Sequence, residues 1–284
     1  MAELISIIVA TYNRPDALDA VLRSLSTQTD RDFEIIVADD GSGAETGRLV
    51  GTWVNRTSIA VKHVWHEDKG FRLAEIRNRA IRVSDGSYCI FLDGDCLARP
   101  GFVAAHRALA RPGWFVTGSR LLLSRELTAE VLGSELAVEQ WGLANWIGQR
   151  FRGRVNRIAP LMLPRSGASG HRNRRRWRGA RGSNMAFWRR DLDAVDGFDA
   201  AFTGWGREDS DIFVRMIRHG VRRKDGRLGA TVLHLWHPEA DRSRLDLNQR
   251  QLDQLLAERR ARAQQGLTWL AQSIERSRRE PAHP

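Results

Sequence analysis

The sequence has only two cysteines and no long apolar segment among its 284 residues. Cys89 and Cys96 are not spaced as a C-x-x-C metal pair, which fits a reducing compartment and a role as small apolar residues. The apolar stretch at residues 4–10 contains Ser6 and is far too short to cross a bilayer. Neither a basic flank nor a cleavage site of small residues accompanies it. We therefore expect a cytoplasmic protein without a signal peptide or a membrane span.

Glycine-rich phosphate loops are also missing. A dinucleotide-binding domain needs G-x-G-x-x-G after its first strand, and here residues 11–14 read TYNR without a glycine. No G-x-x-x-x-G-K-[ST] loop occurs either. Any nucleotide phosphate must therefore be held in another way.

The positive charge is concentrated in one segment. Hydrophobic residues make up 42% of the chain and charged residues 28%, which is typical of a globular protein. The length of 284 residues allows one large α/β domain or two small ones. The net charge is +11, and residues 150–181 contain eleven arginines with no lysine and no acid. Such a tract suits phosphate, an anionic membrane or nucleic acid, and it also fits a solvated loop without a partner. Its prolines and glycines predict an irregular structure.

Strand and helix patterns alternate through the first hundred residues. Short apolar runs predict strands at residues 4–10, 33–38, 60–65 and 88–92, and helical periodicity predicts helices at residues 15–28 and 71–83. This alternation favours a mostly parallel α/β sheet, in which ligands lie beyond the carboxyl ends of the strands. A further strand is expected at residues 230–235. Leucines at helical spacing predict a helical tail whose first half packs on the domain.

Two groups of residues offer metal ligands. Asp93-Gly94-Asp95 follows the fourth strand, where carboxylates suit Mg²⁺ or Mn²⁺ carrying a diphosphate and the glycine lets a ligand approach. The same tripeptide also makes ordinary turns, and a phosphatase or phosphomutase places such a nucleophilic aspartate after its first strand. His234 and His237 lie beside the last strand, and a mixed oxygen and nitrogen ligand set favours Mn²⁺.

Acidic residues gather after a Gly-Trp-Gly sequence in "GWGREDSD", residues 204–211. A helix N-terminus explains one or two of these acids through the helix dipole. It does not explain an aromatic residue between two glycines. The stretch therefore predicts a functional loop, and Glu208 or Asp209 can supply a general base.

These motifs together resemble those of a known family. The stretches "SIIVATYNRPDAL", "IIVADDGS", "GFRLAEIRNRAI", "YCIFLDGDC" and "NMAFWRRDLDAVDGFD" resemble the successive motifs of family 2 glycosyltransferases of GT-A fold, with "DGD" in the place of the DXD motif. "GWGREDSDIFVRM" and "LHLWHP" are similar to carboxy-terminal motifs of β-1,4-galactosyltransferases and of the transferase domains of bacterial chondroitin polymerases. The resemblance runs in order through residues 6–238.

The resemblance implies a Rossmann-like GT-A domain with three parts. Residues 1–119 would bind the nucleotide sugar, residues 120–240 would form the acceptor and catalytic half with the basic tract 150–181, and residues 241–284 would form a basic helical extension.

The resemblance also implies roles for individual residues on the donor side. Thr11, Tyr12 and Asp39 would bind the nucleotide of a UDP-sugar, and Asp93 would reach the ribose or the metal. Arg77, followed by Asn78, would lie near the diphosphate or brace the site.

Metal and acceptor roles follow in the same way. Asp95 and His237 would bind Mn²⁺ (or Mg²⁺), with His234 where the galactosyltransferases place a methionine ligand. Asp209 would be the catalytic base, with Glu208 bonded to sugar hydroxyls. Trp205 and Asn184 would contact the acceptor. Asp211 would be structural, and Arg207 departs from the small residue of the galactosyltransferases.

The resulting hypothesis is an inverting, metal-dependent glycosyltransferase. It would move galactose, glucose, N-acetylgalactosamine, N-acetylglucosamine or glucuronic acid from UDP to a glycan or lipid-linked acceptor of lipopolysaccharide or capsule. We expect it at the cytoplasmic face of the membrane, as a peripheral protein held through residues 150–181.

Two alternatives are a basic nucleic-acid-binding protein and a catalytically inactive glycan-binding relative. The concentration of arginine in one tract argues against the first, because a nucleic-acid reader spreads basic residues over a reading element. The presence of Asp95, Asp209 and His237 argues against the second.

Overall fold

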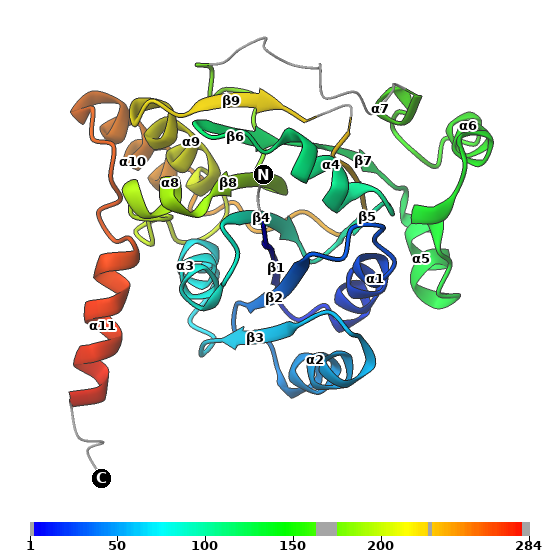
Figure 1. Ribbon diagram of the computed structural model, residues 1–284, viewed down its shortest axis with the longest axis horizontal. Helices are drawn as coiled ribbons and strands as arrows, with labels where there is room; N and C mark the ends of the chain where they lie inside the picture. The colour runs from blue at the N-terminus through cyan, green and yellow to red at the C-terminus, as the bar shows by residue number, and fades with distance from the viewer. Residues whose placement is uncertain (1–2, 163–174, 227–228, 280–284) are drawn as a thin grey trace.

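The computed structural model of the chain describes residues 3–162, 175–226 and 229–279, and a central sheet of seven strands organises them (Figure 1). In spatial order the strands are β3 (Val61–Trp65), β2 (Phe33–Asp39), β1 (Ile5–Thr11), β4 (Tyr88–Asp93), β8 (Asn184–Trp188), β6 (Trp114–Thr117) and β9 (Arg222–Asp225). The first four are parallel to one another, and β8 runs antiparallel to both of its neighbours. This is the mostly parallel α/β sheet that the sequence predicts.

The strand register aligns the carboxyl ends of the three central parallel strands. Thr11 at the end of β1 pairs with Asp39 at the end of β2, and Ala10 pairs with Asp93 at the end of β4. The strands are apolar because helices cover both faces of the sheet, as is usual for parallel strands.

Helices cover the two faces of the sheet in two groups, and each buries an apolar stripe. One core lies under α1, α2, α4 and α5, and the other lies under α3, α8 and α9. The bounds are α1 (Pro15–Ser26), α2 (Ala44–Arg56), α3 (Leu73–Val83), α4 (Phe102–Leu109), α5 (Arg125–Gly133), α6 (Leu143–Phe151), α7 (Ala159–Met162), α8 (Arg189–Ala194), α9 (Glu208–Arg218), α10 (Leu245–Glu258) and α11 (Leu267–Arg279), with a short 3₁₀ turn at Val138–Gln140.

A second, three-stranded sheet lies beside the first. Its order is β5 (Cys96–Ala98), β10 (Thr231–His234) and β7 (Ser119–Leu122). β10 runs antiparallel to β5 and parallel to β7, with His234 opposite Cys96. This pairing places His234 beside the turn that follows β4, although the two segments are far apart in the sequence.

The carboxy-terminal segment is helical, as predicted. Leu252 and Leu255 of α10 are fully buried against Val214 of α9. The next helix, α11, contacts α3, and Leu270 on it is also buried. The first half of the tail therefore packs on the domain, as expected, and the second half contacts it as well.

Several further predictions can be compared with the structure. Both cysteines are buried and unpaired, as expected for small core residues. Residues 163–174 of the basic tract lie outside the described residues, so the irregular structure expected there stays a prediction. The division into two functional halves also stays a prediction, although β8 from the second half lies between β4 and β6. None of the helices in the described part of the chain combines the length and apolar character needed to span a bilayer.

Candidate active site

The nucleotide residues expected from the sequence lie together at the carboxyl edge of the central sheet. Asp39 is fully buried at the end of β2, where it accepts hydrogen bonds from the backbone N–H of Ser42 (2.8 Å) and lies 3.0 Å from Nε2 of His63. Burial raises the pKa of the Asp39 carboxyl, but the hydrogen bonds from His63 and Ser42 outweigh that effect and lower it. Asp39 is therefore held as a fixed carboxylate.

Thr11 ends β1 at the same edge, and Tyr12 follows it. The Thr11 hydroxyl is buried and makes no hydrogen bond within the described chain. Tyr12 is 46% exposed, and its hydroxyl donates to Asp68 at 2.8 Å. The exposed ring of Tyr12 and the unbonded hydroxyl of Thr11 are therefore groups that a nucleotide beside Asp39 can contact.

Three candidate metal ligands converge. Nε2 of His237 lies 3.2 Å from Oδ2 of Asp95, and Nε2 of His234 lies 3.6 Å from Oδ1. One ligand atom from each residue lies within 4.8 Å of the others. Desolvation lowers the pKa of His234 despite the opposing charge of Asp95, and the neutral imidazole is the form that binds a metal.

The glycine between the two aspartates has a structural reason. A Cβ on Gly94 would lie 2.7 Å from the carbonyl oxygen of Ala10 in β1, and the Gly94 N–H donates to that same oxygen. The turn is thus pressed against the end of β1. This close packing requires glycine here for a reason other than the ligand approach expected from the sequence. It also fixes the position of Asp95 relative to Asp93.

A buried arginine connects the aspartate turn to the acidic loop. Arg77 is 1% exposed, donates to Oδ1 of Asp93 at 3.2 Å, and lies 3.7 Å from Oε1 of Glu208. Its neighbour Asn78 is fully buried and bonds to both the N–H and the carbonyl of Phe198. Arg77 therefore faces the site, and Asn78 braces the fold.

The Glu208 carboxyl is strongly perturbed. Burial, followed by the charge of Asp209, raises the pKa of Glu208 to about 7, and Arg77 only partly opposes the shift. One carboxyl oxygen of Glu208 is buried without a partner among the described residues. Such a group can donate a proton in a hydrogen bond to a sugar oxygen near neutral pH.

This shift predicts a pH-dependent stability. The Glu208 carboxyl ionises near 4.5 when unfolded and near 7 when folded, so between these pH values the folded protein retains a proton that the unfolded chain has lost. The free energy of unfolding should therefore fall as pH rises through this interval. Glu208→Gln should reduce the fall by on the order of 2 kcal/mol, measured by urea unfolding at pH 5 and pH 7. Equal pH dependence in the two proteins would contradict the assignment.

The other two acids of the loop have different surroundings. Asp209 accepts the Gly182 N–H at 2.9 Å and the Ser210 hydroxyl at 3.2 Å, and its side chain is half-buried. Asp211 is fully buried and pairs with Arg215, which also donates to two backbone carbonyls. Asp211 thus anchors α9, in agreement with the structural role expected for it.

The Gly-Trp-Gly turn packs on α10. Gly204 has a φ of 73°, and a Cβ there would lie 2.6 Å from Cγ of Arg244. Trp205 is 38% exposed, with the Arg242 guanidinium 5.0 Å from its ring centre. Arg207 precedes α9 with a φ of 78°. The loop is therefore shaped by positive φ values and presents the indole at the surface.

Asn184, predicted to contact the acceptor, is buried and its polar atoms bond within the fold. It is 2% exposed, its amide donates to the Ala230 carbonyl at 2.7 Å, and its Oδ1 lies 3.1 Å from Nε2 of His106. It joins β8 to the residue before β10.

One buried network was missed. Oδ1 of Asp40 lies 2.6 Å from Nε2 of His66, and Glu75 lies on the other side of the ring at 3.7 Å. Desolvation lowers the pKa of His66, but Asp40 and Glu75 outweigh it and raise the pKa. The network connects the motifs "DDGS" and "HEDKG", which follow neighbouring strands. Because one motif has acids and the other a histidine, the sequence did contain a signal for this contact.

Comparisons with known proteins support the family that the motifs suggest. Residues 6–157 match the model of glycosyl transferase family 2, and residues 165–237 match the model described as the N-terminal domain of galactosyltransferase. The validoxylamine A glucosyltransferase of Streptomyces hygroscopicus subsp. jinggangensis is 32% identical over 231 residues, covering 77% of this chain and 52% of the relative. The chondroitin synthase of Escherichia coli is 28% identical over 237 residues, covering 76% of this chain and 32% of the relative. The chain thus spans about half the length of these relatives, or less.

Solved structures support the fold. The S. aureus TarS structure has a TM-score of 0.57 at 16% identity and covers 88% of this chain and 39% of that one. The mannosyltransferase PcManGT from Pyrobaculum calidifontis, in complex with GDP-Man and Mn²⁺, has a TM-score of 0.53 at 21% identity and covers 82% of this chain and 57% of that one. The predicted GT-A fold and family resemblance are thereby confirmed. Because the family model matches more than half of its 284 residues, the chain belongs to glycosyl transferase family 2.

Proposed function

We propose that the protein transfers a sugar from a UDP-sugar to a glycan acceptor by direct displacement with inversion. The observation that carries the proposal is the convergence of Asp95, His234 and His237 at the end of β4, beside the Asp93–Arg77–Glu208 network. The residues proposed to bind the nucleotide lie on one side of this cluster and the acidic loop lies on the other. The anomeric carbon, where the bond to UDP breaks and the bond to the acceptor forms, would lie between them.

The three ligands fit a divalent cation. They offer one carboxylate and two imidazoles from positions that one ion can reach, a donor set suited to Mn²⁺ and tolerable for Mg²⁺. When bound, the ion supplies positive charge that neutralises the diphosphate leaving group. Two structures of similar fold support the proposal: PcManGT, described with Mn²⁺, supports the metal, and TarS, described in complex with UDP-GlcNAc, supports a UDP-sugar donor.

The protein's own groups activate the acceptor. Asp209 takes the proton from the acceptor hydroxyl as that oxygen forms its bond to the anomeric carbon and the bond to UDP breaks. The Gly182 N–H orients the carboxylate. Glu208, with its raised pKa, hydrogen-bonds to a sugar hydroxyl, and the exposed face of Trp205 packs on the sugar ring.

We further propose a lipid-linked acceptor for a surface polysaccharide, such as lipopolysaccharide or capsule, used at the cytoplasmic face of a membrane. One relative of Escherichia coli, 34% identical over 93 residues, is named as a glucosyltransferase acting on α-D-GlcNAc-diphosphoundecaprenol. The arginine-rich composition of residues 150–181 supports attraction to an anionic lipid surface.

A donor panel tests the proposed activity. The protein should release UDP slowly from one or a few of UDP-galactose, UDP-glucose, UDP-N-acetylgalactosamine, UDP-N-acetylglucosamine and UDP-glucuronic acid when Mn²⁺ is present. EDTA should abolish the release, because the diphosphate charge is then no longer neutralised. GDP-mannose serves as the control donor. Turnover of GDP-mannose alone, or of no donor with any metal, would contradict the proposal.

A further inference from the structure

A pocket lined with arginine lies on the acceptor side of the site. Its volume is about 310 Å³. Its walls are β7, β9, the segment before β8 and one residue that follows α6 in the chain, and they include six arginines: Arg120, Arg157, Arg176, Arg178, Arg181 and Arg223. Among the lining residues that the structure describes, Asp225 is the one acid. The pocket is therefore strongly positive.

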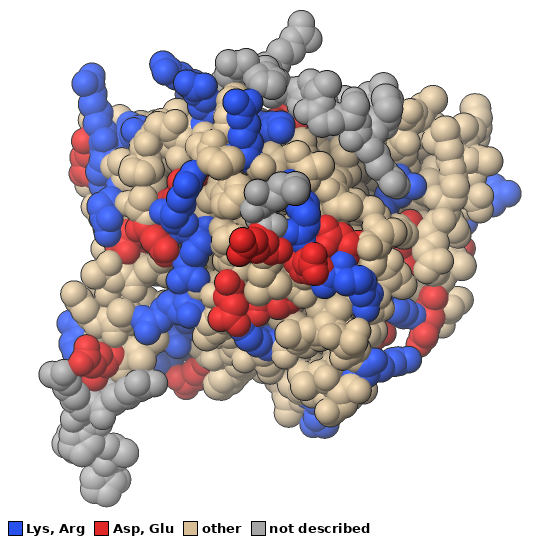
Figure 2. Space-filling view, in the orientation of Figure 1, with Lys and Arg blue, Asp and Glu red and all other residues tan. Residues whose placement is uncertain are grey.

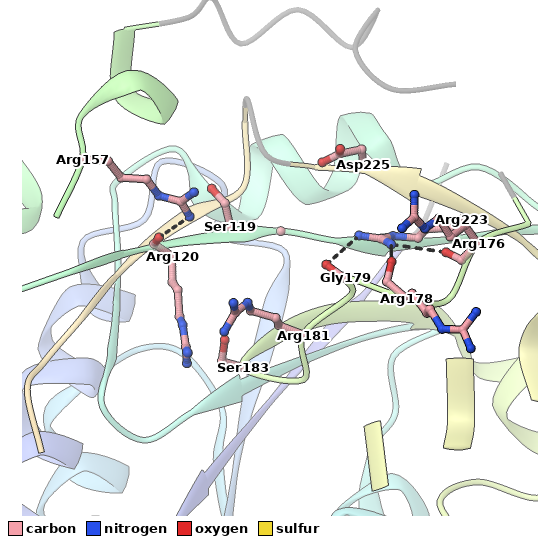
Figure 3. Close-up of a pocket in the computed structure, with 11 residues that line it drawn as sticks. Ser119, Arg120, Arg157, Arg176, Arg178, Gly179, Arg181, Ser183, Arg223 and Asp225 are labelled. Carbon is pink, nitrogen blue, oxygen red and sulfur yellow. Dashed lines mark hydrogen bonds between the residues drawn. The ribbon is translucent and has the colours of Figure 1, made fainter. Parts of the chain in front are cut away.

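The pocket is built into the fold. Arg223 reaches across from β9 and donates to the backbone carbonyls of Arg176, Arg178 and Gly179 at 3.2–3.3 Å. On the other side, Arg157 donates to the carbonyl of Arg120 at 2.7 Å. Figure 3 shows Arg120 and Arg157 entering from one side and Arg176, Arg178 and Arg223 from the other, with Arg181 between them. Two of the arginines thus hold the walls together.

Two other arginines are available to a ligand. Within the described chain, no hydrogen bond or ion pair holds the guanidinium of Arg120 or Arg181. Like charges gathered without acceptors repel one another and are costly unless an anion joins them. Figure 2 also shows basic side chains along the upper edge of the molecule, in the region of β9. This arrangement favours an anion with several acceptor oxygens, and arginine pairs with phosphate in bidentate geometry.

The pocket adjoins the reacting groups. Arg120 lies on β7, which pairs with the strand that carries His234, and it is opposite Val232, two residues before that histidine. The segment that carries Arg181 continues into Gly182, which donates to Asp209, and into Ser183, whose carbonyl accepts the Asp93 N–H at 3.4 Å. An anion in the pocket would therefore lie beside the base.

The strand order separates this pocket from the nucleotide residues. Thr11 and Asp39 lie on β1 and β2, while the pocket lies beyond β4, beside β8, β6 and β9. The nucleoside of UDP would therefore lie away from the pocket, which leaves the pocket to a phosphate of the second substrate. Resting on the function proposed above, we propose that this arginine pocket binds a phosphate or diphosphate group of the acceptor.

The test uses n-butyl phosphate as a probe, in calorimetry with the full-length protein, Mg²⁺ and saturating UDP. The wild type should bind the probe, and Arg120→Gln combined with Arg181→Gln should weaken binding by at least about tenfold, because the charge-assisted hydrogen bonds are lost. The control is Arg48→Gln with Arg82→Gln, which removes the same charge from exposed positions on α2 and α3. It should leave binding within about twofold.

Three outcomes would overturn the inference. Equal weakening in both double variants would show attraction to overall charge, competition between the probe and UDP would place the donor diphosphate in the pocket, and no binding to the wild type would remove the site. Failure of this proposal and of the proposed function are distinguishable. A protein that binds the probe but releases UDP from no donor contradicts only the function, and the converse contradicts only the pocket.

To identify the source of the phosphate, binding to vesicles of phosphatidylcholine containing phosphatidic acid can be measured for the wild type and both double variants. We expect n-butyl phosphate binding to respond to the pocket variant whether or not vesicles bind. The pocket is assigned to a substrate phosphate if vesicle binding falls equally in both double variants while the control double variant still binds n-butyl phosphate. Vesicle binding lost only in the pocket variant, with n-butyl phosphate binding unchanged in that variant, would assign it to a headgroup and overturn the proposal.

Discussion

Replacing Asp209 by asparagine is expected to reduce kcat for sugar transfer by about 10²- to 10⁴-fold, because the acceptor hydroxyl then loses the carboxylate that takes its proton. An asparagine oxygen can still accept the Gly182 N–H, and its amide can bond to the Ser210 hydroxyl, so the loop should keep its shape. Initial rates at saturating donor and acceptor measure the effect.

The control for this variant is donor binding. Asp209 is not one of the three candidate ligands, so UDP affinity in the presence of Mn²⁺ should stay within about twofold of the wild-type value. An unchanged kcat would remove Asp209 as the base. A large loss of UDP affinity would instead show that the residue acts through the donor site.

Replacing Asp95 by alanine is expected to lower activity by at least about a thousandfold, because charge neutralisation by a metal contributes several kcal/mol and about 1.4 kcal/mol corresponds to tenfold. Rates measured against Mn²⁺ and Mg²⁺ concentration should no longer saturate. The carboxylate is the one oxygen donor of the cluster, and the two imidazoles alone leave an incomplete site.

A matched variant of the same cluster separates loss of a ligand from general damage. His234→Met replaces an imidazole by a thioether, which can still coordinate, at a residue that is mostly buried. Activity should remain within about tenfold of wild type, with a changed preference between Mn²⁺ and Mg²⁺. Activity in Asp95→Ala equal to that in His234→Met would contradict the assignment of Asp95 as the central ligand.

The elements with strong local patterns could be predicted from the sequence. The expected strands at residues 4–10, 33–38, 60–65 and 88–92 correspond to β1, β2, β3 and β4 within one or two residues. β1, β2 and β4 are short, mainly apolar, buried runs followed by polar residues, whereas β3 contains Lys62 and His63 and is only partly buried. The helix expected at residues 15–28 begins with Pro15, as proline at the first helical turn favours, and ends at Ser26.

Helix α2 was not predicted, and its sequence shows why. Residues 44–56 include Gly47 and Gly51, which lower helix propensity, and only Thr46, Val50 and Trp53 are buried. The apolar stripe is therefore short and easily read as a loop. Packing on β3 and α1, which is a property of the whole fold, compensates for the weak local signal.

The site depends on contacts that local patterns do not encode. The pairing of β10 with β5 joins residues more than a hundred positions apart, and it alone brings His234 to Asp95. The acidic turn and the two histidines suggested a mixed ligand set, and the family resemblance assigned these residues to one ion, but the strand pairing that joins them was not predicted. The raised pKa of Glu208 likewise depends first on its burial in the folded chain, so the sequence could name the acid but not its shifted pKa.

Anomalous diffraction from crystals grown with Mn²⁺ and UDP tests the central claim most directly. We predict one strong manganese peak within bonding distance of Asp95, His234 and His237, with the UDP diphosphate on the same ion and the nucleoside beside Asp39. A manganese peak elsewhere, or UDP bound away from these three residues, would contradict it.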